Sequence, residues 1–130
     1  MKVAFCLFGE PRTMEFCYPS MKKHILDIYN PDVFVCSNEQ ESKIRELYTP
    51  VAIEIRSQES EEVVMGEHKW RYGKVQPCPN QPAYPKYPPR DLSGMYKAWR
   101  CGKLLKEYEN SHGEYDVVMT TRFDNKFLYV

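Results

Sequence analysis

Short apolar runs along the chain predict four β-strands. Lys2–Phe8 and Asp32–Ser37 are almost entirely apolar, as expected for strands that are buried on both faces of a parallel sheet. Apolar and polar residues alternate in Val51–Ile55, which predicts a third strand nearer a sheet edge. Tyr115–Thr121 predicts the fourth strand, and we expect it to lie in the centre of the sheet.

Two helices are predicted between the first three strands. Apolar residues recur every three or four positions in Met14–Ile28. Pro19 cannot donate a backbone hydrogen bond, so the regular helix should begin near Pro19. Asn30-Pro31 should end it. A second, highly charged helix is predicted over Glu39–Tyr48, with most of its surface in solvent.

The strongest helical pattern covers Asp91–Glu109. Asp91 or Ser93 can cap its first turn, and His112-Gly113 should end it. The predicted apolar face contains Leu92, Met95, Tyr96, Trp99, Leu105 and Tyr108.

The segment from residue 57 to residue 90 has no sustained period and holds six of the ten prolines. So long a loop in a compact domain indicates a functional element or disorder, and its aromatic residues argue against plain disorder. Its aromatic and basic side chains could close over a substrate as a lid. The interpretation we prefer is a proline-rich excursion that packs its tyrosines on the sheet edge.

The order of these elements predicts one α/β domain over residues 1–130, with a Rossmann-like, mainly parallel sheet flanked by helices. Such sheets bind ligands beyond the carboxyl ends of their strands, where the strand order reverses. Three predicted loops lie at that edge: Gly9–Thr13, Ser37–Glu41 and Arg122–Asn125. The search for functional residues therefore centres on these loops.

Charge and cysteine content narrow the classes of function. The chain has 18 basic and 18 acidic residues, whereas nucleic-acid binding without sequence specificity and docking on anionic membranes both need a basic excess. The longest apolar run, Val3–Phe8, is far shorter than the roughly 20 residues of a membrane-spanning helix. Five cysteines, with no CxxC spacing, indicate a reducing compartment and therefore the cytoplasm.

The first candidate site is the loop Gly9–Thr13. A glycine after a buried strand lets the backbone come close to a ligand, and Arg12 can hold a phosphate with two parallel N–H groups. The chain has no GxGxxG dinucleotide fingerprint, no P-loop, no GxSxG and no HExxH. The alternative is an ordinary turn with a solvated arginine.

The second candidate site is Arg122-Phe123-Asp124, directly after the fourth strand. Asp124 could coordinate a hard divalent cation that bridges to a diphosphate, and Arg122 could neutralise charge on a leaving nucleotide. The alternative is an Arg–Asp ion pair in a surface turn. Without further context we favour that alternative, because short charged turns are common.

Four segments in this order resemble a known family: Val3–Thr13, Asn30–Ser37, Leu92–Glu109 and Tyr115–Asp124. They carry the motifs G-x-P-R-T, N-P-D-V-F-V, L-S-x-M-Y-K-A-W and Y-D-V-V-M-T-T-R-F-D, whose order is more specific than any one of them. The arrangement is similar to that of glycosyltransferases of polysaccharide gene clusters and large DNA viruses. The resemblance implies the donor-binding half of a GT-A-like fold, which binds a nucleotide-diphosphate sugar and serves a glycan acceptor.

The resemblance also implies roles for individual residues. In GT-A enzymes a D-x-D motif holds a divalent metal and the donor diphosphate, and Arg122-Phe123-Asp124 matches that motif here. Asp124 would hold Mn²⁺ or Mg²⁺, and Arg122 would replace part of the metal's charge. A viral member would act in the host cytoplasm. The implied donor-binding residues are Gly9, Arg12, Thr13, Ser93, Tyr96, Arg122 and Asp124, with Ser93 and Tyr96 at the border of the same cleft.

GT-A transferases continue well past this motif, whereas the sequence ends six residues after Asp124. We therefore expect a truncated chain or a donor-binding half without full activity. Two alternatives stay open. One is a non-catalytic interaction domain that keeps the fold and forms a homodimer across an open sheet edge. The other is a nucleotide-sugar hydrolase that uses the same residues.

Overall fold

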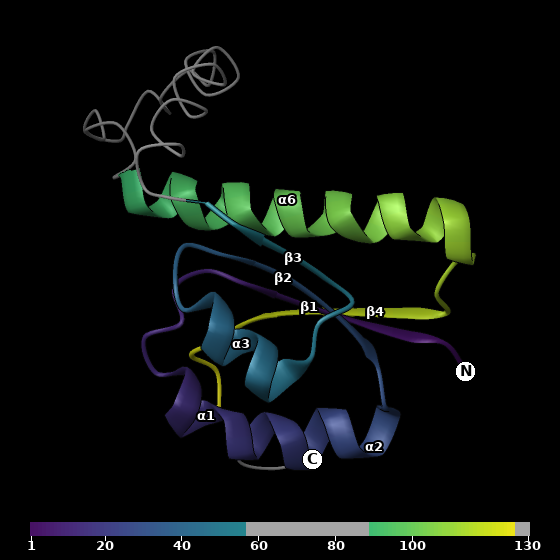
Figure 1. Ribbon diagram of the computed structural model, residues 1–130, viewed down its shortest axis with the longest axis horizontal. Helices are drawn as coiled ribbons and strands as arrows, with labels where there is room; N and C mark the ends of the chain where they lie inside the picture. The colour runs from purple at the N-terminus through teal and green to yellow at the C-terminus, as the bar shows by residue number, and fades with distance from the viewer. Residues whose placement is uncertain (57–88, 127–130) are drawn as a thin grey trace, which may run out of the picture.

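Strands and helices alternate along the chain, as the sequence predicts. The computed structural model describes residues 1–56 and 89–126, and of residues 89–93 it describes the backbone alone. Most of the predicted loop over 57–90 and the final apolar stretch from Phe127 lie outside the described residues. In chain order the elements, labelled as in Figure 1, are β1 (Val3–Phe8), α1 (Met14–Met21), the π-helical turn η1 (Lys22–Leu26), α2 (Asp27–Tyr29), β2 (Asp32–Ser37), α3 (Glu41–Tyr48), β3 (Ala52–Ile55), α6 (Pro89–His112) and β4 (Val117–Arg122).

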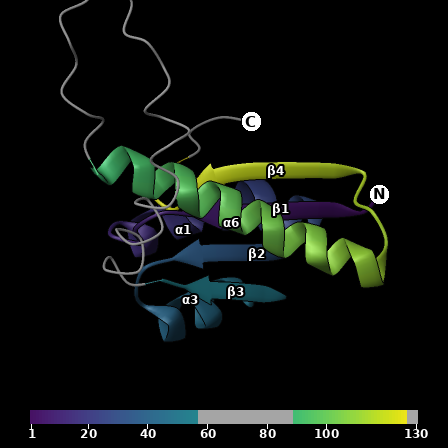
Figure 2. The ribbon, with the colours of Figure 1, turned by 90° about the horizontal axis from the view of Figure 1, so that it is seen from above.

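The described strands form one sheet in the order β3-β2-β1-β4, and all neighbouring pairs are parallel. The arrowheads of β2, β3 and β4 point the same way in Figure 2. The predicted α/β class with a parallel sheet is confirmed, and so is the place of β3 at an edge. The chain builds β1, β2 and β3 outward and then returns to the other side of β1 for β4. The strand order therefore reverses between β1 and β4.

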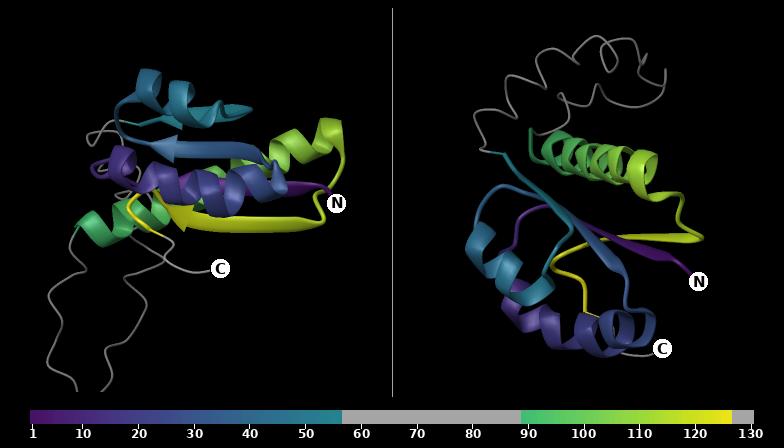
Figure 3. Two further views of the ribbon diagram at one scale, coloured as in Figure 1. Left: turned by 90° about the horizontal axis from the view of Figure 1, so that it is seen from below. Right: turned by 45° about the vertical axis from the view of Figure 1, so that its right-hand side comes forward.

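Helices cover both faces of the sheet (Figure 3). Side chains alternate between the two faces of a strand, so β1 and β2 turn their odd-numbered residues to α1 and α3 and their even-numbered residues to α6. The core on the α1 and α3 side contains Phe5, Leu7, Met14, Met21, Val33, Val35, Ile44, Tyr48 and Phe123. The core on the α6 side contains Ala4, Cys6, Phe34, Cys36, Cys101 and Leu105.

Helix α1 begins at Met14, so the predicted start near Pro19 is wrong. Pro19 lies inside the helix, where it removes one backbone donor. The chain then widens into the π-helical turn η1, and its N–H groups find acceptors further back along the chain, as between Asp27 N–H and the Lys22 carbonyl. Burial of Met14, Cys17 and Met21 on one stripe keeps the helix in place despite the proline.

Helix α6 buries a face that matches the predicted one only in part, since Leu105 and Tyr108 do pack in the core on the α6 side. Met95 and Trp99 are 56% and 44% exposed, whereas Lys97, Cys101 and Leu105 pack against the sheet. A lysine does not stand out in an apolar pattern, and Cys101 was left off the predicted face, so only part of the buried stripe was predicted. The predicted end is confirmed, because Gly113 follows His112 with a left-handed φ of 86° and donates to the Glu109 carbonyl.

The fourth strand lies at an edge of the described sheet, so its predicted central position is wrong. It runs from Val117 to Arg122, and Tyr115 instead precedes it and donates its hydroxyl to Asp32 at 2.6 Å. Val117 and Val118 are 39% and 46% exposed. An apolar run reads the same in a central strand and in an edge strand, because the pattern shows side-chain character and not the number of neighbouring strands.

The described cysteines, Cys6, Cys17, Cys36 and Cys101, are all buried and free. Cys6 and Cys36 lie within strands, which confirms their predicted place in the core. Among the described helices, none has the length and apolar character needed to cross a membrane.

Candidate functional site

The carboxyl ends of the strands bring two of the predicted loops together. Phe8, near the end of β1, pairs in register with Cys36 of β2 on one side and with Arg122 of β4 on the other. The loop that begins at Gly9 and the loop that begins after Arg122 therefore leave the sheet from adjacent positions. This is the point where the strand order reverses, and open parallel sheets bind their ligands there.

Gly9 makes a turn that only glycine adopts readily. Its φ is 102°, a conformation strained for residues with a side chain. The Gly9 N–H donates to the Cys36 carbonyl at 3.1 Å, and the buried Ser37 hydroxyl donates to the Gly9 carbonyl at 2.8 Å. A Cβ added at Gly9 would meet no described atom within 4 Å. The turn is thus fixed to the end of β2 and leaves open space beside its α-carbon.

The rest of the first loop leads into α1. Arg12 is exposed and forms an ion pair with Glu10 of its own loop. Thr13 precedes α1, where its carbonyl accepts the Cys17 N–H at 3.0 Å. Arg12 therefore needs only to exchange a solvated partner to reach an anionic ligand, and such exposed pairs are weak.

In the second loop, Arg122 and Asp124 form an ion pair of 3.0 Å in which both side chains are exposed. The surface ion pair that we weighed against a ligand site is therefore the observed arrangement of these two side chains. Phe123 between them is fully buried and meets the Tyr48 ring edge-on, with centroids 5.9 Å apart. The aromatic residue anchors the turn and directs its two charged neighbours to solvent.

Asp124 is the residue that the resemblance assigns to a metal. Among the described residues no three or more His, Cys, Asp or Glu side chains converge on one point. A Mg²⁺ or Mn²⁺ ion held by Asp124 would need most of its ligands from a diphosphate and from water, which is a usual mode for Mg²⁺. The carboxylate fits that mode once it separates from Arg122.

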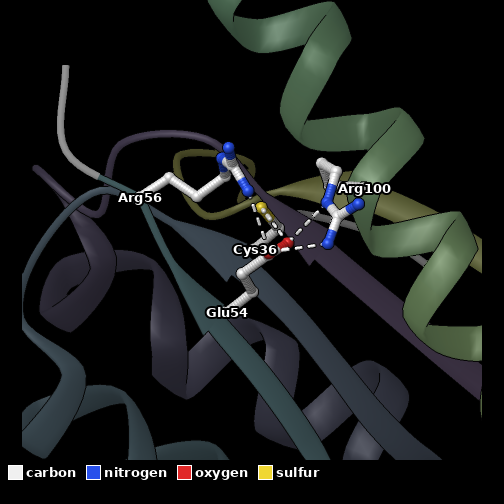
Figure 4. Close-up of polar contacts among 4 residues, drawn as sticks. All are labelled: Cys36, Glu54, Arg56 and Arg100. Carbon is white, nitrogen blue, oxygen red and sulfur yellow. Dashed lines mark hydrogen bonds and ion pairs between the residues drawn. The ribbon is translucent and has the colours of Figure 1, made fainter. Parts of the chain in front are cut away.

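A second polar group, which the sequence reasoning missed, lies at the β3 end of the same edge (Figure 4). We call it the Glu54 cluster: Cys36 of β2, Glu54 of β3, Arg56 just after β3, and Arg100 of α6. Arg100 donates two hydrogen bonds to the Glu54 carboxylate, at 2.8 and 2.7 Å. Arg56 donates a third, at 3.0 Å. All three charged side chains are only about one-fifth exposed.

The charges in the Glu54 cluster shift its acid–base equilibria. The hydrogen bonds from Arg100 are the largest cause that lowers the pKa of Glu54, and Arg56 adds to it. Burial, with the Glu54 carboxylate nearby, raises the pKa of the Cys36 thiol to about 12. Glu54 is therefore ionised and Cys36 neutral near pH 7. A neutral thiol is a poor nucleophile, so the geometry favours binding rather than cysteine chemistry at this point.

Tyr96 lies at the end of the carboxyl edge that holds the Glu54 cluster, and not at the end that holds Gly9. Its ring lies 5.2 Å from the Arg56 guanidinium, within the range of a cation–π contact. Lys97 is almost fully buried and acts on the Cys36 thiol through its charge. The side chain of Ser93, the other predicted residue of α6, lies outside the described residues.

The two ends of the edge are connected by one row of side chains. Glu54 pairs with Cys36, Cys36 with Phe8, and Phe8 with Arg122. Residues in register on parallel strands share a face, so this row lies on the α6 side of the sheet. Three strand spacings of about 4.8 Å each separate its ends. A ligand about 14 Å long could therefore contact both Arg122 and the Glu54 cluster.

One sequence signal could have indicated the Glu54 cluster. Glu54 interrupts Val51–Ile55 at a position that faces the same side as Cys36. A carboxylate on a half-buried strand face requires a cationic partner. Arg56 two residues later satisfies part of that need, but nothing in the pattern identifies Arg100, which comes from the other side of the segment 57–88.

A separate groove of about 380 Å³ lies at the opposite end of the sheet, near the amino ends of β2 and β3. Asp32, Tyr48 and Thr49 contribute to its walls, and it contains none of the predicted site residues. Comparisons with protein-family models, curated proteins and solved structures gave no match for this chain.

Proposed function

We propose that the carboxyl edge of the sheet binds a nucleotide-diphosphate sugar, and that the chain is a glycosyltransferase or the donor-binding half of one. The observation that carries the proposal is the register of β1 with β4. It sets the Gly9–Thr13 loop beside Arg122 and Asp124 where the strand order reverses. The sequence resemblance to glycosyltransferases assigns donor binding to the same two loops.

In this proposal the chain supplies backbone and charge to the donor. The open space beside Gly9 admits the diphosphate, and Arg12 and Arg122 exchange their acidic partners for its oxygens. Asp124, released from Arg122, holds Mn²⁺ or Mg²⁺ against the same diphosphate. When bound, the metal would withdraw charge from the leaving nucleoside diphosphate.

Calorimetric titration with UDP-, GDP- and CMP-sugars, with and without Mn²⁺, tests the proposal. We expect one class to bind, more tightly with Mn²⁺. Arg122→Gln should weaken that binding about tenfold, because it removes a charge-assisted hydrogen bond. Asp124→Asn should abolish the gain from Mn²⁺.

Arg45→Gln is the matched control, since Arg45 also forms an exposed ion pair, with Glu41 of α3, and neither residue belongs to the two loops that carry the proposed donor-binding residues. It should bind the donor as the unaltered chain does. The proposal fails if a demonstrably folded chain binds none of these donors with or without Mn²⁺.

The exposed edge of β4 favours a second candidate, an interaction domain that pairs with a copy of itself. Within the described sheet, β4 bonds only to β1, and it carries the exposed Val117 and Val118. An antiparallel pairing of two such strands centred on Met119 would set Asp116 of one copy opposite Arg122 of the other. Opposite charges at both ends favour that register over its slipped alternatives.

Light scattering coupled to size-exclusion chromatography tests this second candidate. We expect a dimer at tens of micromolar protein, and we expect Val118→Lys to yield a folded monomer, because an inserted edge charge disfavours strand pairing. A strictly monomeric unaltered chain at these concentrations would rule the pairing out.

A further inference from the structure

Among the described residues, the partner of Arg56 and Arg100 neutralises only part of their positive charge. Glu54 supplies one negative charge against the two of these arginines, an excess of one (2 − 1). Cys36 adds no negative charge, since burial raises the pKa of its thiol to about 12. A partly buried cationic group of this kind favours an anionic ligand.

The donors of the two arginines are held in fixed directions. The two hydrogen bonds of Arg100 to Glu54 fix the plane of its guanidinium. The Arg56 guanidinium is fixed by its contact with the Tyr96 ring and by one hydrogen bond to Glu54. The Arg56 Nε is buried and has no hydrogen-bond partner among the described residues. Glu54 thus orients both cations without using all their N–H groups, of which an arginine has five.

A neighbouring side chain also has an unsatisfied polar atom, but this atom is an acceptor. Asn38 follows β2 directly, and its Oδ1 is buried without a hydrogen-bond partner among the described residues. The Arg56 N–H donates to the Ser37 carbonyl at 2.9 Å, so Asn38 and Arg56 leave adjacent strands at the same level. Buried polar atoms usually have partners. The Arg56 Nε lacks an acceptor, which an anionic ligand would supply, whereas the Asn38 Oδ1 is itself an acceptor and needs a donor such as a bound water.

We propose that Arg56 and Arg100 form an oxyanion-binding site of their own, which takes a phosphate or diphosphate group at the β3 end of the carboxyl edge. Planar guanidinium groups match the oxygens of a phosphate in pairs, which suits this ligand class. The site does not depend on the proposed donor. The phosphate group could belong to the donor or to another phosphorylated compound, because the two guanidinium groups would bind the oxygens of either in the same way.

Titration of inorganic pyrophosphate into the full chain tests the site, with thermal melts to show that each variant is folded. We expect Arg100→Gln to weaken pyrophosphate binding at least tenfold, because it removes a charge-assisted donor. Glu54→Gln should strengthen it severalfold, because the competing carboxylate is gone. Arg45→Gln should leave it unchanged.

The Glu54→Gln result keeps the test decisive even if Arg100→Gln does not fold. A purely structural ion pair would not gain anion affinity when its carboxylate is neutralised. A parallel titration with the nucleotide sugars identifies the source of the phosphate. A joint loss of both affinities in Arg100→Gln would place the donor's diphosphate at the β3 end instead of beside Gly9, and loss for pyrophosphate alone identifies another phosphate compound. Both results support the site, whereas equal pyrophosphate affinity in all folded variants overturns it.

Discussion

Replacement of Phe123 by alanine is expected to lower the free energy of unfolding by about 3–5 kcal/mol, the usual cost of truncating a fully buried phenylalanine. The ring is 0% exposed and lies edge-on to Tyr48 within the core on the α1 and α3 side. Domains of this size are stable by only about 5–15 kcal/mol, so the change would remove a large share of that stability. Urea-induced unfolding followed by circular dichroism measures it.

The flanking residues are the controls for this change. Arg122→Ala and Asp124→Ala each remove one side of an exposed ion pair and should alter the free energy of unfolding by about 0.5 kcal/mol or less. The loss of unfolding free energy should therefore be large for Phe123→Ala and small for the two neighbouring substitutions. A loss below about 1 kcal/mol in Phe123→Ala, against the range of 3–5 given above, would contradict the packing described for this turn.

Glu54→Gln is expected to lower the free energy of unfolding by about 1–3 kcal/mol at pH 7 in phosphate-free buffer. Removing one partner of a fully buried ion pair costs about 3–5 kcal/mol, and these side chains are about one-fifth exposed. The amide keeps the shape of the carboxylate but leaves Arg56 and Arg100 without a counter-charge. Unfolding in urea at a series of pH values gives the difference between the two chains.

The pH dependence of that difference identifies its cause. The pKa of Glu54 lies below its ordinary value of 4.5, chiefly because Arg100 donates hydrogen bonds to it. Its stabilisation is therefore complete above the unfolded pKa and is lost as the pH falls through the lower folded pKa. The two chains should converge in acid. A constant difference from pH 7 to acid would show that the charge is not responsible. Glu41→Gln, in an exposed helical pair, is the control with little expected effect.

The sequence predicted most of the fold because burial leaves a strong pattern. β2 is all apolar apart from its ends, and it was predicted with its observed bounds. The β4 edge was missed because an apolar run does not reveal how many strands flank it. The buried stripe of α6 was predicted only in part: Leu105 and Tyr108 were placed in it, and Lys97 was missed because a lysine carries no apolar signal.

The same limit applies to the candidate site: one part of it could be predicted from the sequence, and the other could not. Gly9 and Arg122 could be placed at one edge because the parallel order alone decides which strand ends meet. The Glu54 cluster could not be predicted in this way, because it joins β3 to α6 through two residues, Glu54 and Arg100, that are 46 positions apart in the sequence. Contacts of that range depend on how the helix crosses the sheet, which no local pattern encodes.

Mapping of the bound donor on the isotope-labelled chain by NMR tests the central claim most directly. Titration with the nucleotide sugar that binds should shift the backbone amide signals of Gly9, Thr13 and Asp124 at the carboxyl edge. The amides of Asp32 and Thr49, beside the groove at the opposite end, should stay in place. Shifts confined to Asp32 and Thr49, with none at Gly9 or Asp124, would contradict donor binding at the carboxyl edge.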